Sequence, residues 1–202
     1  MEETVTKQQT RLLSPMVDRM RIEKVVSQIP HDSHVIDIGC GSALLASHLS
    51  KSCSYVGVDK DPEIIKFNQK RFSHHAFHCF DVCGSVFPFP SDHFSVAVLA
   101  AFLAQIDNPR VMLTEVRRVL RPEGLVVITT PSQAGGWVHD IVSSVGLLRH
   151  HAAEEHKGFL NKEKMKAALE STGLELDRYE KFEMGLNQIF VLKKMLRSGV
   201  VQ

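Results

Sequence analysis

Short apolar runs alternate with amphipathic segments along residues 34–130, and this alternation is the feature that most limits the possible folds. The apolar runs are 35–38, 54–58, 76–80, 94–99 and 124–130. Apolar residues at helical spacing fill the intervals at 62–72 and 109–120. Strands joined by helices form parallel sheets with helices on both faces, because a parallel connection must cross back over the sheet. The sequence therefore predicts an α/β protein with a doubly wound, mostly parallel sheet.

The regions on either side of this core carry their own patterns. Residues 15–29 have the apolar spacing of an amphipathic helix, which Pro30 ends. A helix is predicted at 161–171, and two short runs at 174–182 and 188–194 predict an antiparallel hairpin at the sheet edge. We expect one domain over residues 1–202. Its parts are an N-terminal helical segment (1–33), a core of alternating strands and helices (34–131), an insertion (132–160) and a helix with the C-terminal hairpin (161–194).

Composition excludes several classes of protein. The chain has 202 residues, 44% of them hydrophobic, which suits one globular domain with a sizeable core. Its formal net charge of +1 offers no general attraction for a nucleic acid. The 4 cysteines cluster in the first half, which favours reduced thiols over a disulfide framework. With neither a signal-peptide pattern nor an apolar run of membrane-spanning length, we expect a cytoplasmic protein without a membrane span.

A glycine turn after the first predicted strand carries most of the chemistry in the sequence. Gly39 and Gly41 allow a sharp turn and a close ligand approach, and helical spacing resumes at Leu44, so we expect a nucleotide-like ligand over a helix N-terminus. Asp37 would repel a diphosphate and favour a ligand with positive charge. Leu44 also stands where the dinucleotide fingerprint requires its third glycine. These features count against a nicotinamide dinucleotide.

Two further acids end the next predicted strands. Asp59 follows the second strand and is placed to accept hydrogen bonds from ribose hydroxyls, while Asp61 is the better candidate for the N-cap of the next helix. Asp81 ends the third strand in the same way. Because the carboxyl ends of parallel strands form the ligand crevice, three successive strands end in an acid on the ligand side.

These residues occur in the order of a known family. The sequence from 35 to 131 resembles the class I S-adenosylmethionine-dependent methyltransferases, and is most similar to the ubiquinone/menaquinone-type small-molecule branch. The resemblance implies a Rossmann-like sheet of seven strands with an antiparallel last strand. It is carried by Asp37, Gly39, Gly41, Asp59 and Asp81, then by Phe87-Pro88-Phe89-Pro90, Phe94-Ser95-Val96, Asp107-Asn108-Pro109 and the stretch from Glu115 to Gly124.

The resemblance implies a role for each cofactor-binding position. Gly39, Cys40 and Gly41 would pass beneath the methionine part of S-adenosylmethionine, and Asp37 would orient its ammonium group directly or through water. Asp59 would hold the ribose hydroxyls. Along the adenine, the resemblance places Lys60 beside the ring, Asp81 at the amino group and the Val82 amide near the ring. Around the methionine and sulfonium it places Leu99 and Ala100. S-adenosylhomocysteine would be the product.

The sequence also departs from the family pattern. Ala43 replaces the third glycine of the turn, and Ser95 replaces the aspartate of the usual Phe-Asp-Val. The Leu-Glu-His that often follows that strand is Leu103-Ala104-Gln105 here. These changes leave the cofactor positions intact and leave the substrate chemistry open.

Three residues are candidates for the catalytic step. Methyl transfer from a sulfonium is an in-line displacement, and a base is needed only when the nucleophile arrives protonated. His156 lies in the insertion expected to cover the crevice, where the alternative is a solvated loop histidine. Glu183 and Asn187 lie between the last two predicted strands in a pattern similar to that of some small-molecule methyltransferases, where the alternative is a turn.

No metal site is expected. His74, His75, His78, Cys79 and Cys83 have zinc-binding side chains, but their spacing fits no familiar site, and 76–80 is needed as a strand. The sequence thus predicts methyl transfer from S-adenosylmethionine to a small organic acceptor. A non-catalytic cofactor-binding or scaffold protein is the first alternative and a nicotinamide oxidoreductase the second. The identity of the acceptor and the oligomeric state are left open.

Overall fold

The computed structural model describes residues 14–83, 86–103, 106, 108–133 and 160–196. The strands are β1 (His34–Ile38), β2 (Ser54–Asp59), β3 (Ala76–Cys79), β4 (Phe94–Ala100), β5 (Leu120–Pro131), β6 (Leu174–Phe182) and β7 (Asn187–Lys194). The helices are α1 (Ser14–Val26), α2 (Pro62–Arg71), α3 (Pro109–Val119) and α5 (Lys162–Leu169), with short 3-10 turns η1 (Leu45–Ser47) and η3 (Glu183–Gly185).

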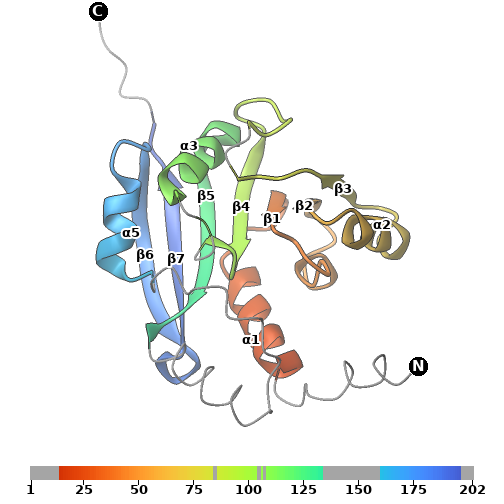
Figure 1. Cartoon of the computed structure of the whole chain (residues 1–202), viewed down its shortest axis with the longest axis horizontal. Coiled ribbons are helices and arrows are strands. Elements are labelled where there is room, and N and C mark those ends of the chain that lie inside the picture. The colour runs from red at the N-terminus through yellow and green to blue at the C-terminus, as the bar shows by residue number, and fades with distance from the viewer. Residues whose placement is uncertain (1–13, 84–85, 104–105, 107, 134–159, 197–202) are drawn as a thin grey trace, which may run out of the picture.

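The seven strands form one sheet in the order β3-β2-β1-β4-β5-β7-β6 (Figure 1). The first five strands are parallel to one another. Strand β7 runs antiparallel to both β5 and β6, and the turn that joins it to β6 is too short for the crossover that a parallel pair would need. The predicted doubly wound sheet and the antiparallel hairpin at its edge are confirmed.

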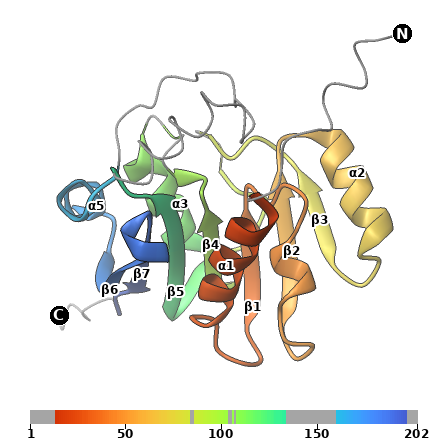
Figure 2. The ribbon, with the colours of Figure 1, turned by 90° about the horizontal axis from the view of Figure 1, so that it is seen from below.

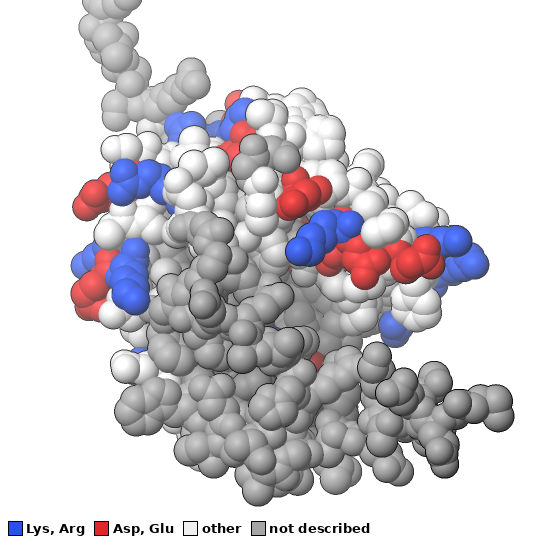
Figure 3. All heavy atoms as spheres, viewed as in Figure 1, with Lys and Arg blue, Asp and Glu red and all other residues white. Residues whose placement is uncertain are grey.

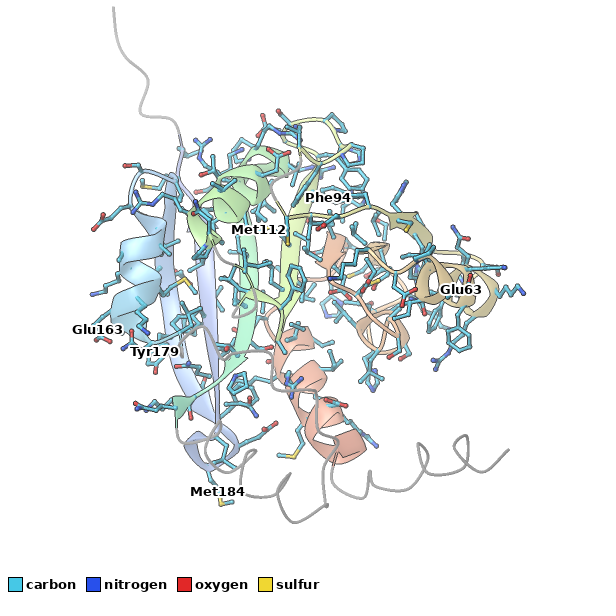
Figure 4. The ribbon with its side chains drawn as sticks, viewed as in Figure 1. Glu63, Phe94, Met112, Glu163, Tyr179 and Met184 are labelled. Carbon is cyan, nitrogen blue, oxygen red and sulfur yellow. The ribbon has the colours of Figure 1, made fainter. Side chains whose placement is uncertain are left out.

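Helices cover both faces of the sheet, as the alternation of side chains along each strand requires (Figures 1 and 2). On one face, Val35 and Val98 pack with α1 and α2 through residues such as Val25 and Ile65. On the other face, the alternate strand residues pack with α3 and α5. Phe94 and Met112 point into this second layer (Figure 4).

The structure corrects the prediction of a helix after the glycine turn. Only the three-residue turn η1 forms there, with hydrogen bonds from each amide to the carbonyl three residues earlier, such as His48 N to Leu45 O (3.0 Å). The positive φ of Ala43 (52°) takes the backbone out of the right-handed helical region just before this turn. The prediction of a ligand over a helix N-terminus therefore lacks its regular helix, because only a single 3-10 turn follows the glycines.

Strand β5 begins earlier than the predicted 124–130. Leu120 directly follows α3 and pairs with Phe94, and a register irregularity in β4 separates this pair from the next one, Val96 with Leu125. Glu123 takes a positive φ (63°) inside the strand. The sequence 121–124 resembles a turn because Pro122 and Gly124 are turn residues, and the pairing partner that extends the strand is remote in sequence.

The described surface carries mixed charge. In the face shown in Figure 3, basic and acidic side chains lie next to one another, in keeping with the formal net charge of +1. In the part of the chain that the structure describes, every helix is too short or too polar to cross a membrane.

Most of the predicted substrate-covering insertion lies outside the described residues. Of 132–160, the structure describes 132, 133 and 160, so the candidate His156 is among the residues it does not place. Within the described ranges, no group of three or more histidine, cysteine or acidic side chains comes together as metal ligands would. His74, His75, His78 and Cys79 are among the described side chains that form no such group.

Candidate functional site

The glycine turn, residues 39–41, follows the carboxyl end of β1 and is hydrogen-bonded to the carboxyl end of β2. The amides of Gly39 and Cys40 both donate to the carbonyl oxygen of Val58, each at 2.9 Å. Gly39 and Gly41 have positive φ values of 73° and 48°, which glycine adopts without steric cost. The turn therefore leaves the end of β1 and lies against the end of β2, where it meets Asp59.

Asp59 links the glycine turn to the start of α2. Its Oδ2 accepts a hydrogen bond from the Gly41 amide at 2.9 Å, and its Oδ1 accepts one from the Asp61 amide at 3.1 Å. Asp61 caps α2 by accepting from the amides of Glu63 and Ile64, as predicted. Each carboxylate oxygen of Asp59 can accept a second hydrogen bond, so the side chain can hold a diol while it holds the turn.

Asp37 is a buried acid two residues before the turn, and its charge acts on Cys40 within the turn. Its side chain is only 4% exposed, and its Oδ2 accepts a hydrogen bond from the Tyr55 hydroxyl at 2.8 Å. Burial raises the pKa of Asp37 to about 7, against the hydrogen bond from Tyr55, and the nearby charge of Asp59 adds to the rise. Because an acid with such a pKa is only partly ionised near neutral pH, a cation placed beside it would favour its ionised form.

Sequence reasoning missed two residues that hold this arrangement. In the sequence pattern, Tyr55 on β2 is one more apolar strand residue, and Asn68 on α2 is one more polar helix residue. Asn68 is fully buried, and its Nδ2 donates to the Gly41 carbonyl oxygen at 2.7 Å. Burial raises the pKa of the neighbouring Cys40 thiol, which therefore stays neutral. Neither Tyr55 nor Asn68 has a local sequence signal, because their partners lie on other elements.

Gly39 has a second reason to be glycine. A Cβ built at this position would lie 2.5 Å from the Phe102 ring, whereas a Cβ at Gly41 would meet nothing within 4 Å. Phe102 comes from the segment after β4, so the end of that strand also borders the turn. The glycine turn is thus enclosed on one side and open on the other.

Gly39→Ala is expected to destabilise the protein more than Gly41→Ala. Both substitutions place a side chain at positive φ, at a cost of roughly 1 kcal/mol or more, and only the first forces the Phe102 ring to move. We expect the free energy of unfolding in urea to fall by about 2–4 kcal/mol for Gly39→Ala and by about half as much for Gly41→Ala. Equal losses would contradict the role given to Phe102.

The remaining predicted cofactor positions lie at the same edge of the sheet. Lys60 follows Asp59 and is exposed. Asp81 lies after β3, where its exposed carboxylate accepts a hydrogen bond from the Cys83 amide at 2.9 Å, while Val82 is buried. At the end of β4, Ala100 is half-buried and Leu99 packs fully buried in the core on the α3 face.

The turn between β6 and β7 reaches this edge from the other side. Asn187 opposes Pro131, the last residue of β5, so the turn lies beside the carboxyl end of that strand. Asn187 Nδ2 donates to Glu183 Oε2, and Glu183 has a positive φ of 51°. The other carboxylate oxygen, Glu183 Oε1, is buried without a hydrogen-bond partner among the described residues. Met184, at the tip, points away from the sheet (Figure 4).

Comparison with known proteins identifies the family to which the chain belongs. A family model of the methyltransferase domain matches residues 6–179, most of the chain. The chain belongs to the class I S-adenosylmethionine-dependent methyltransferase family. Asp37, the glycine turn and Asp59 all fall within the matched range.

Individual relatives agree with this assignment. An uncharacterized methyltransferase of Mycobacterium tuberculosis is 32% identical over 109 residues, 52% of this chain and 55% of the relative, so the match spans about half of each protein. The ubiquinone/menaquinone biosynthesis C-methyltransferase of Campylobacter jejuni is 22% identical over 189 residues, 81% of this chain and 80% of the relative. The crystal structure of an S-adenosylmethionine-dependent methyltransferase from Methanosarcina mazei superposes with a TM-score of 0.63 at 20% identity, covering 91% of this chain and 99% of that one.

Proposed function

We propose that this chain transfers a methyl group from S-adenosylmethionine to a small organic acceptor. The observation that carries the proposal is the joint placement of two acids at one glycine turn: Asp59 on the Gly41 amide and Asp37 buried two residues before the turn. The pair suits a ligand with a ribose diol and a cationic amino acid part. It suits a diphosphate poorly, because two carboxylates would repel it.

S-adenosylmethionine fits the groups present and would supply an electrophilic methyl group on its sulfonium. Asp59 would accept hydrogen bonds from the two ribose hydroxyls through the lone pairs that the backbone amides leave free. Asp37 would attract the ammonium group, and Gly39, Cys40 and Gly41 would give it room. Lys60, Asp81 and Val82 would border the adenine, and Ala100 and the Leu99 backbone would border the methionine.

The acceptor would lie where β4 and β5 end and β7 begins. Ala100 pairs with Thr129 on β5, and two residues further along β5 Pro131 pairs with Asn187. The chain's task there is to align the nucleophile with the methyl group and to keep water out. Glu183 Oε1 is a buried carboxylate oxygen at this edge with no hydrogen-bond partner among the described residues, so it would accept a hydrogen bond or a proton from the nucleophile. His156, the first candidate from the sequence, stays a prediction for the same role.

Two measurements test the function. Calorimetry should show that S-adenosylhomocysteine binds and NADH does not. Incubation with S-adenosylmethionine and a panel of phenols, quinones and carboxylates should then release S-adenosylhomocysteine with at least one acceptor. Binding of S-adenosylhomocysteine without turnover on any acceptor would favour the non-catalytic alternative, and binding of NADH alone would contradict the proposal.

Glu183→Gln is expected to slow methyl transfer about 100-fold or more while leaving the affinity for S-adenosylhomocysteine unchanged. Glutamine keeps an oxygen for the Asn187 amide but cannot take a proton, and general-base catalysis is worth about that much. Met184→Ala is the matched control, because Met184 occupies the same turn and is 99% exposed. Equal turnover in wild type and Glu183→Gln would reduce Glu183 to a turn residue.

A further inference from the structure

Helix α3 carries an ion pair that grips the backbone of the segment between β3 and β4. Arg118 donates to Glu115 through Nε (2.9 Å to Oε2) and Nη2 (2.6 Å to Oε1). The same guanidinium donates to the carbonyl oxygens of Phe89 (2.9 Å) and Phe87 (3.0 Å), and Glu115 Oε1 accepts from the Phe87 amide at 2.7 Å. We call Glu115 and Arg118 the α3 clamp.

The α3 clamp differs from an ordinary surface ion pair, because its side chains are largely buried and also hydrogen-bond the backbone. The side chains of Glu115 and Arg118 are 16% and 30% exposed. Burial acts to raise the pKa of Glu115, but hydrogen bonds from Arg118 and from the Phe87 amide outweigh it, and its pKa lies below the usual value. Both groups therefore stay ionised near neutral pH, and their bonds to the backbone are charge-assisted and strong.

The gripped residues contact the segment that follows β3. Phe87 is buried, and its ring lies 5.8 Å from the Phe80 ring between centroids. The Phe89 ring lies 6.1 Å from Phe80 and 5.2 Å from Phe94 in the sheet. Phe80 also donates its amide to the Asp59 carbonyl oxygen at 3.1 Å. Movement of Phe87 or Phe89 would therefore displace Phe80.

Phe80 immediately precedes Asp81 and Val82, the residues that would border the adenine. The Asp81 carboxylate already accepts from the Cys83 amide, and the Val82 side chain is buried in the same core cluster as Phe87. Asp81 is exposed and has no helix or strand of its own to fix it, so its position depends on the chain on either side. The α3 clamp fixes the part of that chain at Phe87 and Phe89.

We propose that Glu115 and Arg118 are positioning residues that set recognition of the adenine by holding 80–83 in place through Phe87 and Phe89. The proposal rests on the proposed function, because it assumes that Asp81 meets the amino group of the adenine. Glu115 and Arg118 would act through the backbone of Phe87 and Phe89 and not by contact with the cofactor. Their effect on binding should therefore concern the base and not the amino acid part of the ligand.

Calorimetry with two ligands that differ only in the base tests the proposal. S-adenosylhomocysteine has an amino group where S-inosylhomocysteine has an oxygen, and an oxygen would repel the Asp81 carboxylate. We expect the wild type to prefer the first ligand by roughly tenfold or more, the value of one hydrogen bond to a charged group. In Arg118→Met the preference should fall to about threefold or less, because Asp81 is no longer held against the base.

Arg110→Met is the matched control on the same helix. Arg110 also donates to a backbone carbonyl, that of Ala167 at 3.0 Å, and lies 3.6 Å from a glutamate, Glu170, but these partners belong to α5 and the chain that follows it. Arg110→Met should therefore keep the full preference for S-adenosylhomocysteine. General destabilisation of the protein lowers the affinity for both ligands equally and leaves the ratio of the two affinities unchanged. The ratio therefore separates an effect on positioning from an effect on stability.

Glu115→Gln keeps an oxygen for the Phe87 amide and carries the test if Arg118→Met does not fold. Its preference should also fall, by about half as much on a logarithmic scale. An unchanged ratio in a folded clamp variant, or a wild type that does not distinguish the two ligands, would overturn the inference while leaving the proposed function standing. Failure of the wild type to bind S-adenosylhomocysteine at all would instead overturn the proposed function.

Discussion

Asp59→Ala is expected to raise the Kd for S-adenosylhomocysteine by about 10- to 150-fold. This corresponds to roughly 1.5–3 kcal/mol, the cost of removing hydrogen bonds from two ribose hydroxyls to a charged acceptor. The substitution also removes the acceptor for the Gly41 amide, so the open side of the glycine turn loses its tie to β2. Calorimetry at pH 8 measures the change directly.

Two further variants separate the charge of Asp59 from its structural bonds. Asp59→Asn keeps one acceptor oxygen for the Gly41 amide and should lose less affinity than Asp59→Ala. Asp61→Ala removes the N-cap of α2, which should cost about 1 kcal/mol of stability and leave the Kd within twofold of the wild type. Wild-type affinity in Asp59→Ala would remove Asp59 from the cofactor site.

Binding of S-adenosylhomocysteine is expected to strengthen about tenfold between pH 6 and pH 8. The reason is the raised pKa of Asp37, about 7, which burial produces in the unliganded protein. The ammonium group of the ligand interacts favourably only with the ionised carboxylate, so at pH 6 most molecules must lose a proton before they bind. Calorimetry at several pH values gives the affinity, and its repetition in buffers of different ionisation enthalpy counts the proton released.

Asp37→Asn is the control for this pH dependence. Asparagine keeps an acceptor for the Tyr55 hydroxyl, so the buried contact survives, but the variant should bind S-adenosylhomocysteine weakly and equally at pH 6 and pH 8. A wild-type affinity that does not change with pH would show that Asp37 does not meet the charged group of the ligand.

The same acid should make the unliganded protein less stable at high pH. The folded-state pKa of Asp37 lies above the usual value of 3.8 for an aspartate, so the folded state binds the proton more tightly than the unfolded state. This stability is fully present below about pH 4 and is lost as the pH rises to about 7, by at most roughly 4 kcal/mol. Asp37→Asn should therefore gain stability over the wild type in urea unfolding at pH 8 and show little difference near pH 4.

Much of the fold could be predicted because its signals are local. Strands β1, β2 and β4 are buried on both faces and appear as continuous apolar runs, and the hairpin appears as two runs separated by a turn. The helix predicted after Leu44 was wrong, because only the three-residue turn η1 forms there, and apolar spacing does not reveal whether a single turn continues into a helix. The early start of β5 was missed because it depends on pairing with Phe94, which is remote in sequence.

The candidate site divides in the same way. Asp37, Gly39, Gly41 and Asp59 could be predicted as one cluster because the carboxyl ends of parallel strands meet at the same edge of the sheet, and their role in cofactor binding stays a prediction. Glu183 and Asn187 were predicted as a pair, and the structure places both beside the end of β5. Their role in catalysis, like that of His156, stays a prediction.

The sequence by itself determined the doubly wound sheet and the edge of the sheet at which its acids gather, because strand ends, glycines and apolar periodicity are properties of neighbouring residues. Only the tertiary structure decided that Tyr55 holds Asp37, that Asn68 and Asp59 hold the glycine turn, and that Glu115 and Arg118 grip the chain beside Asp81. Each of these contacts joins elements far apart in the sequence. Burial and hydrogen bonding of this kind follow from how the elements pack against one another, and no local pattern records them.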